Sequence, residues 1–372
     1  MRDVLPTPTG SSSTRLPPDQ TGRRVLLRSV AALMALSGTA RATGVTASPV
    51  GAPPPEPFPE TVGLLVPGPQ DGRMERWAGL IGPALRDAMP PGTRLRHLSR
   101  GGADGVTAAN QFTARVTPDG GTALLVPGET VLAWLAGDPR ARFDAAGWLP
   151  VLAGLTSGVL CSRIPATALH PGISLRVACA SQTGPELAAL LGLDLMGIEP
   201  LPVRGVHDAA AARQALATQA ADAVLLSGPM TREQLADAAA LGAAPLFTLG
   251  MPTAGGTARD PLLPGLPIAP ELIGRLRGPP PTAGLVAAWR AAAAAAVTEF
   301  ALVLPPLTPA TLVAMWRHAG TEAAPDLQTQ TRGLRLLAGA EASAATTTMA
   351  CDAARMLELR RWLAMRLNWR PA

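Results

Sequence analysis

The feature that most constrains the fold of this chain is a repeated alternation of short apolar runs, turns and amphipathic segments. Residues 64–66 are apolar, and apolar side chains then recur at helical spacing from Trp77 to Ala88. Segments of helical character at 106–116 and 185–191 are interleaved with further apolar runs at 122–126 and 175–179. This alternation predicts an α/β fold with largely parallel strands.

The same reading assigns most of the remaining chain. Proline and glycine at 90–92 end the first helix, and 251–270 is rich in turn residues and is expected to be loop. We expect further strands at 95–98, 222–226 and 245–249, with an extended apolar run at 151–161, and further helices at 208–219, 285–300, 309–318 and 353–367.

Two strand-to-helix junctions carry the residue types of an anion site. The first follows 64–66 and reads PGPQDG (67–72); the second reads ASQTGPE (180–186). The first N–H groups of a helix have no partner within it and can hold a carboxylate. Thr183 and Glu186 have the spacing of a capping box, with Pro185 in the first turn. We expect a capped helix there, with the hydroxyls of Ser181 and Thr183 as a polar rim for a ligand.

Composition narrows the class of protein. The chain has 372 residues, enough for one large domain or two lobes, and 47% are hydrophobic against 16% charged, which is typical of a globular protein. The net charge is +5, but all 32 basic residues are arginine and only 3% are aromatic. A nucleic-acid-binding surface needs clustered positive charge with aromatic side chains, so this composition argues against nucleic-acid binding.

The N-terminal segment predicts export. Arg23 and Arg24 precede an apolar stretch at 30–36, and Ala40 and Ala42 fit the small-residue rule for a signal peptidase. We expect residues 1–42 to be a cleaved signal peptide, either of the twin-arginine type or a plain secretory one, and 43–60 to be a flexible leader. The apolar stretch is shorter than the roughly 20 residues of a membrane span. The mature protein is therefore expected in the periplasm.

The cysteines and histidines show no pattern of a metal or catalytic site. Cys161, Cys179 and Cys351 are too few and too widely spaced for a disulfide framework or a zinc site. Cys161 and Cys179 could pair in an oxidising compartment, although buried thiols are the favoured interpretation. The sequence has no G-x-S-x-G, Walker or H-E-x-x-H motif, and His207-Asp208 fits a helix entry capped by Asp208. We therefore expect no enzyme activity, cofactor or metal.

An ordered set of short motifs resembles one family of periplasmic binding proteins. The mature chain is similar to the Bug-type solute receptors of tripartite tricarboxylate transporters, which have a proline- and glycine-rich turn, a Pro-Asp-Gly-Tyr-Thr-Leu-Leu-Leu strand, an Asp-Phe-x-Pro-Val segment and a Pro-Tyr-Lys/Arg-Gly loop. The corresponding residues here are VP (66–67), RGGADG (100–105), PDGGTALL (118–125), FD (143–144) with LPV (149–151), PVRG (202–205), GLP (265–267) and Glu358 with RW (361–362).

The resemblance implies a type 2 binding protein with two lobes, each a mixed, mostly parallel sheet flanked by helices. Lobe 1 would span 61–158, lobe 2 would span 159–265, and 266–372 would return to lobe 1. A monomer would close on a small organic acid and deliver it to the membrane transporter. The residues implied in binding are Gly68, Pro69, Gln70, Asp71, Gly72, Arg73, Gly128, Glu129, Thr130, Ser181, Gln182, Thr183, Gly184, Arg204 and Gly205.

Several positions depart from the family pattern. Asp71 stands in a loop that is usually a run of glycines, where it would repel a carboxylate unless Arg73 compensates it. Glu186 replaces a frequent histidine, Val203 replaces a tyrosine, and Ser181 and Thr183 replace glycines. These changes favour a less anionic ligand, such as an amino acid or an amide, or a degenerate clamp.

The alternative is a repurposed scaffold that acts as a sensor or interaction protein. The C-terminal helix is basic and could meet an acidic partner or the membrane surface. Its arginines are Arg355, Arg360, Arg361, Arg366 and Arg370. The favoured interpretation is that Leu357, Trp362 and Leu363 pack on a lobe while the arginines are solvated.

Overall fold

The computed structural model describes residues 57–273, 275 and 280–369. The expected signal peptide, most of the expected leader and Arg370 lie outside the described residues. None of the helices within the described ranges is both long enough and apolar enough to cross a membrane.

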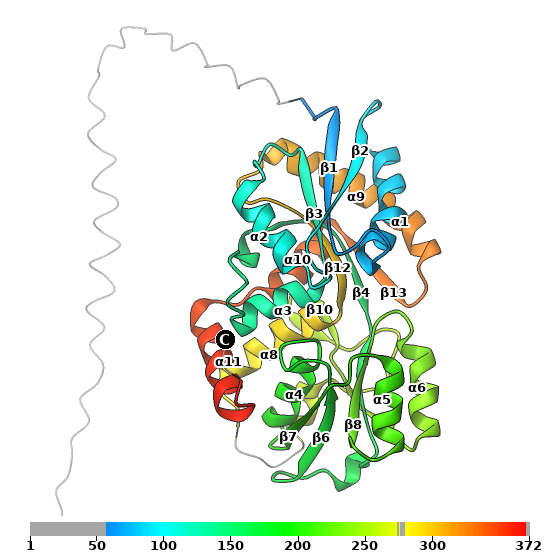
Figure 1. Cartoon of the computed structure of the whole chain (residues 1–372), viewed down its shortest axis with the longest axis vertical. Coiled ribbons are helices and arrows are strands. Elements are labelled where there is room, and N and C mark those ends of the chain that lie inside the picture. The colour runs from blue at the N-terminus through cyan, green and yellow to red at the C-terminus, as the bar shows by residue number, and fades with distance from the viewer. Residues whose placement is uncertain (1–56, 274, 276–279, 370–372) are drawn as a thin grey trace, which may run out of the picture. The chain divides into compact units, whose positions relative to one another are not determined.

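The larger of two main sheets forms the first lobe (Figure 1). Its six described strands lie in the order β13-β4-β12-β3-β1-β2. β1 pairs in parallel with both β2 and β3, whereas β12 pairs antiparallel with β3 and β4, and β13 pairs antiparallel with β4. The bounds are β1 (Thr61–Pro67), β2 (Arg94–Arg100), β3 (Thr122–Val126), β4 (Leu149–Thr156), β12 (Thr298–Leu304) and β13 (Leu334–Ala338).

The second sheet repeats the parallel pattern. Its five described strands lie in the order β7-β6-β8-β5-β9, with β6 parallel to β7 and β8, and β5 antiparallel to β8 and β9. The bounds are β5 (Gly158–Ser162), β6 (Ser174–Cys179), β7 (Glu199–Arg204), β8 (Ala223–Ser227) and β9 (Ala244–Thr248). A hairpin of β10 (Met251–Thr253) and β11 (Gly256–Ala258) follows.

Helices cover both faces of the first sheet because alternate strand residues point to opposite sides. Val62, Leu64 and Val66 of β1 share a core with α1 and α9, whereas Leu65 belongs to the core on the other face. The helices are α1 (Arg73–Ala88), α2 (Val106–Arg115), α3 (Gly128–Ala136), α4 (Glu186–Leu195), α5 (Ala209–Ala217), α6 (Thr231–Ala240), α7 (Ala269–Ile273), α8 (Ala283–Ala296), α9 (Ala310–Gln330), α10 (Gly339–Met349) and α11 (Ala353–Arg366).

The chain passes between the lobes in extended segments and along α8. β4 ends at Thr156 in the first sheet and β5 begins at Gly158 in the second. On α8, the fully buried Trp289 donates from Nε1 to the backbone oxygen of Ala188 in α4, at 3.0 Å. One apolar core runs from the first sheet through α8 to the second sheet. The predicted two-lobe α/β class is confirmed.

Two segment predictions are wrong because long-range pairing overrode local pattern. The helix expected at 285–300 ends at Ala296, and Thr298 begins β12, which is inserted between β3 and β4. The alanine run favours helix, but the β-branched Val297 and Thr298 and the partners on both sides favour strand. The region expected as loop at 251–270 contains the β10–β11 hairpin and the start of α7.

The cysteines do not pair. All three are buried and free within the described chain. β8 lies between β5, which carries Cys161, and β6, which carries Cys179, and the two side chains belong to cores on different faces. A bond across an intervening strand is geometrically excluded.

Candidate functional site

The carboxyl ends of β1, β2 and β3 lie at one edge of the first sheet, and a helix begins after each. These strands are parallel neighbours, so α1, α2 and α3 all begin at that edge. The N-cap residues Gly72, Gly105 and Pro127 have no side chain that can cap a helix, although Oδ1 of Asp104 accepts from the first N–H of α2, that of Val106, at 3.3 Å. Helix N-termini carry partial positive charge, so their convergence makes this edge suited to an anion.

A hollow of about 310 Å³ lies at this edge. The structure brings Gly68, Pro69, Gly72, Arg73 and Glu129 together around it, joined by Asp104, which the resemblance did not implicate. Gly68 has φ of +93°, a conformation that favours glycine and lets the chain turn from β1 toward α1. Gln70 and Asp71 belong to the same loop, but they are exposed and do not line the hollow.

Arg73 is held by acidic residues rather than left free for a ligand. Its Nη2 lies 2.8 Å from both carboxylate oxygens of Glu129, and its Nε lies 3.6 Å from Oε1 of Glu299. Glu299 is buried and also accepts from Nε1 of Trp77 at 2.9 Å. Burial opposes the charge of Arg73, yet the two carboxylates raise its pKa. Arg73 therefore pairs with Glu129 and Glu299, and no ion pair joins it to Asp71 among the described residues.

Residues 128–130 form the first turn of α3. Gly128 is buried, and a Cβ there would collide with the backbone oxygens of Ala295 and Thr298. The hydroxyl of the fully buried Thr130 donates to the backbone oxygen of Asp104 at 2.7 Å. Of these three residues, Glu129 lines the hollow.

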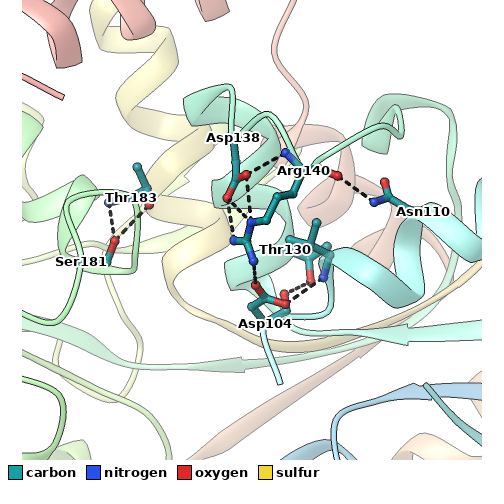
Figure 2. A network of polar contacts seen from close by, with 8 residues as sticks. Asp104, Asn110, Thr130, Asp138, Arg140, Ser181 and Thr183 are labelled. Atoms are coloured by element: carbon teal, nitrogen blue, oxygen red, sulfur yellow. Dashed lines mark hydrogen bonds and ion pairs between the residues drawn. The ribbon is translucent and has the colours of Figure 1, made fainter. Parts of the chain in front are cut away.

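The second sheet presents an equivalent edge, where α4, α5 and α6 follow the parallel strands β6, β7 and β8. Asp208 caps α5 as predicted, accepting from the N–H of Ala211 at 2.8 Å. The capping box predicted for α4 is wrong. Within the described chain no side chain caps α4; the hydroxyl of Ser181 instead accepts from the N–H of Thr183 at 3.2 Å (Figure 2).

Gln182 and Arg204 are brought together, but they bind each other. Oε1 of the buried Gln182 accepts from Nη2 of Arg204 at 3.0 Å, and Nε2 donates to the backbone oxygen of Leu367 at 3.0 Å. Gln182 thus links its loop to the chain after α11. Gly205 is exposed, with φ of +89°.

Glu186 is the least satisfied acid of this edge. Its Oε1 accepts from the N–H of Ala180 at 3.3 Å, while Oε2 is buried without a hydrogen-bond partner among the described residues. Burial raises the pKa of Glu186, and hydrogen bonds from its own backbone N–H and from that of Ala180 oppose this change. The negative charge of Glu129 adds a smaller increase, which the charge of His207 opposes. Glu129 and Glu186 thus repel each other from the edges of the two lobes.

Sequence analysis missed a network around Arg140, which follows α3. Arg140 lies 2.6 Å from Asp138 and 2.8 Å from Asp104, and its backbone oxygen accepts from Asn110 at 2.7 Å (Figure 2). The network ties the turn before α2 to the segment after α3. The glycine-rich turn that contains Asp104 was visible in the sequence, but its distant partner Arg140 was not.

The C-terminal helix uses several of its arginines within the fold. Arg360 donates to the backbone oxygens of Trp134 and Leu135 at the end of α3, and Arg366 lies 3.2 Å from Asp194. Trp362 and Leu363 are buried as expected. Leu357 is about half exposed, contrary to the prediction. Leu359 is buried instead, because it lies three and four residues before Trp362 and Leu363 and so shares their face of the helix.

No protein-family model and no curated protein matches the sequence. Among solved structures, the chain is similar to a TctC solute-binding protein from Polaromonas, with 15% identity and a TM-score of 0.58 over 82% of this chain and 97% of that one. The chain has the fold of a solute-binding protein. The two-lobe binding-protein fold that the resemblance to Bug-type receptors implied is thus confirmed.

Two further matches have lower TM-scores. BugD, a periplasmic binding protein, is 17% identical with a TM-score of 0.49 over 82% of this chain and 97% of that one. MatC from Rhodopseudomonas palustris, solved with bound malate, is 20% identical with a TM-score of 0.47 over 81% and 97%.

Proposed function

We propose that this protein is a solute-binding receptor that closes its lobes on a small organic acid. The observation that carries the proposal is the hollow beside Gly68 and Gly72, which lies where α1 begins and is also lined by the turn before α2 and by Glu129 in the first turn of α3. Backbone N–H groups and helix dipoles there bind the ligand carboxylate without an unpaired basic side chain. The α4 edge of the second lobe, with Ser181 and Thr183, closes over the ligand.

The acidic residues define a preferred subclass of ligand. Arg73 is already engaged by Glu129, and Glu186 adds a second acid from the other lobe. A dianion would meet both carboxylates, whereas an amino acid places its carboxylate at the helix N-termini and its ammonium near the acids. Within the organic acids, the charges therefore favour an amino acid, or an amide with a donor at the same place.

We also propose export to the periplasm and delivery of the ligand to a membrane transporter of the tripartite tricarboxylate type. The arginine pair and apolar stretch near the N-terminus support export. The fold of a solute-binding protein supports delivery, because such a scaffold carries its ligand to a partner rather than converting it. A monomer suffices for this role.

The test is a thermal-shift screen of the purified, refolded protein, followed by calorimetry on any ligand found. The set contains mono-, di- and tricarboxylates, amino acids and amides. A ligand at 100 times its dissociation constant adds about 2.7 kcal/mol to stability, enough to raise the melting temperature by several degrees. Saturable binding of one of these classes supports the receptor. A folded protein that responds to none of them contradicts it and favours the interaction protein.

A further inference from the structure

A second hollow, of about 260 Å³, lies inside the second lobe. It is enclosed by β6 and β8 on one side and by α5 and α6 on the other, and these elements lie together in Figure 1. It shares no lining residue with the hollow beside Gly68.

The body of this hollow is apolar, and its origin is visible in the sequence. α5 and α6 place the buried alanines Ala212 and Ala238 on it, opposite Ala178, Val224 and Leu226 of the sheet. Helices that carry alanine at such positions do not fill the space between helix and sheet that larger side chains would occupy. An apolar cavity of about 150 Å³ is large enough for benzene, so this hollow has room for a small ring with a substituent.

One part of the lining is polar and carries two carboxyl groups. Glu186, His207, Asp208 and Ser227 contribute to it. Asp208 is engaged in capping α5, but Oε2 of Glu186 is buried with no hydrogen-bond partner in the described chain. A buried carboxylate oxygen without a donor is costly, so this atom lacks one N–H or O–H group.

The solvent side of the hollow is marked by an ion pair. Arg213 of α5 and Asp237 of α6 line the hollow, lie 3.2 Å apart, and are each more than half exposed. An exposed pair of this kind contributes little stability, so it can open at small cost. Arg213 is compensated by Asp237, which leaves no uncompensated arginine in the lining to attract an anion.

We propose that this hollow binds a small primary amine with an apolar body, whose ammonium group lies at the polar end of the hollow beside the carboxyl group of Glu186. The apolar body lies against Ala178, Ala212, Val224 and Ala238. The hollow shares no lining residue with the hollow beside Gly68, but both proposals place an ammonium group near Glu186. Variants of the alanines that line this hollow therefore distinguish the two sites.

The experiment is calorimetric titration of the full chain at neutral pH with three matched probes, benzylamine, benzyl alcohol and benzoate. Benzylamine should bind saturably and at least about tenfold more tightly than benzyl alcohol. A hydrogen bond between charged groups raises the affinity by about this factor relative to a neutral one. Benzoate should not bind, since Glu186, Asp208 and Asp237 repel it. Equal binding of benzylamine and benzyl alcohol would overturn the amine assignment, and absence of benzylamine binding would overturn the site.

Variants locate the site. Ala212→Leu and Ala238→Leu fill the hollow from opposite helices and should each abolish benzylamine binding. Ala210→Leu adds the same bulk at an exposed position of α5 and is the matched control. Glu186→Gln keeps the shape and removes the charge, so it should weaken benzylamine at least about tenfold and leave benzyl alcohol unchanged.

Thermal melts of each variant establish that it is folded. The alanine variants separate this site from the receptor site, because they leave the hollow beside Gly68 untouched. If benzylamine still binds to folded Ala212→Leu and Ala238→Leu proteins, it binds elsewhere and the proposal is wrong.

Discussion

Nη2 of Arg73 lies 2.8 Å from both carboxylate oxygens of Glu129, joining the first turns of α1 and α3 across the mouth of the hollow beside Gly68. The two residues are 56 positions apart in the chain. Because the pair is partly exposed, its direct contribution to stability is about 0–1 kcal/mol. The Arg73–Glu129 ion pair matters for ligand binding, because it sets how much positive charge the hollow presents to a ligand.

Removing Arg73 should weaken binding of the organic acid. In Arg73→Ala the carboxylates of Glu129 and Glu299 lose their counter-charge, and we expect the affinity to fall about tenfold or more. Arg86→Ala is the matched control, because this substitution removes the same charge from an exposed position at the other end of α1. Calorimetry on both variants measures the effect, and equal affinities would refute a role for Arg73.

Removing Glu129 should have the opposite effect on dianions. Glu129→Gln keeps the side-chain shape but leaves Arg73 with Glu299 alone, so dicarboxylates should gain affinity relative to amino acids by several fold. Calorimetry with a dicarboxylate and its amino-acid analogue gives the ratio. An unchanged ratio would mean that this pair does not select the ligand.

Gly128 should not tolerate alanine. A Cβ at this position collides with the backbone oxygen of Ala295, which cannot move without displacing α8. We expect Gly128→Ala to lower the free energy of unfolding by about 1–3 kcal/mol or more, as overpacking does. Gly79→Ala is the control, since Gly79 is exposed within α1 with no neighbour near its Cβ and alanine there should add about 0.5–1 kcal/mol. Urea denaturation of both variants tests the contrast.

The raised pKa of Glu186 should make the free energy of unfolding depend on pH. Burial raises the pKa of Glu186 above the ordinary value of 4.5, so the folded state holds a proton that the unfolded state has lost. The contribution of Glu186 to the free energy of unfolding is therefore fully present below pH 4.5 and is lost as the pH rises through the raised pKa. The Glu186→Gln variant has no carboxyl group to titrate at this position. Its free energy of unfolding, relative to that of the native protein, should therefore increase with pH. A pH-independent difference would contradict the assignment.

The thiols should be inert until the protein unfolds. Burial raises the pKa of Cys161 to about 12 and also raises the pKa of Cys179, so neither is a thiolate at neutral pH. We expect no alkylation of either in the native state and alkylation of both in urea, followed by mass spectrometry. A native mass two hydrogens lower, with no free thiol at these positions, would show a disulfide instead.

Much of the fold could be predicted from local pattern. The strands at 64–66, 122–126 and 175–179 and the cap at Asp208 were visible because hydrophobic periodicity and capping chemistry act over a few residues. The two-lobe arrangement followed from the family resemblance. β12 was not visible, because its strand character depends on β3 and β4, which lie far away in the sequence.

The sequence by itself determined which segments end in glycine-rich turns at helix starts, and so where an anion site could form. Only the tertiary structure decided which side chains meet there. Arg73 contacts Glu129 rather than Asp71, and the hydroxyl of Thr130 donates to the backbone of Asp104. Glu186 has a buried oxygen without a hydrogen-bond partner among the described residues. The physical reason is that turn and helix preferences are local, whereas charge pairing and burial depend on strand order, which brings distant residues to one edge of each sheet.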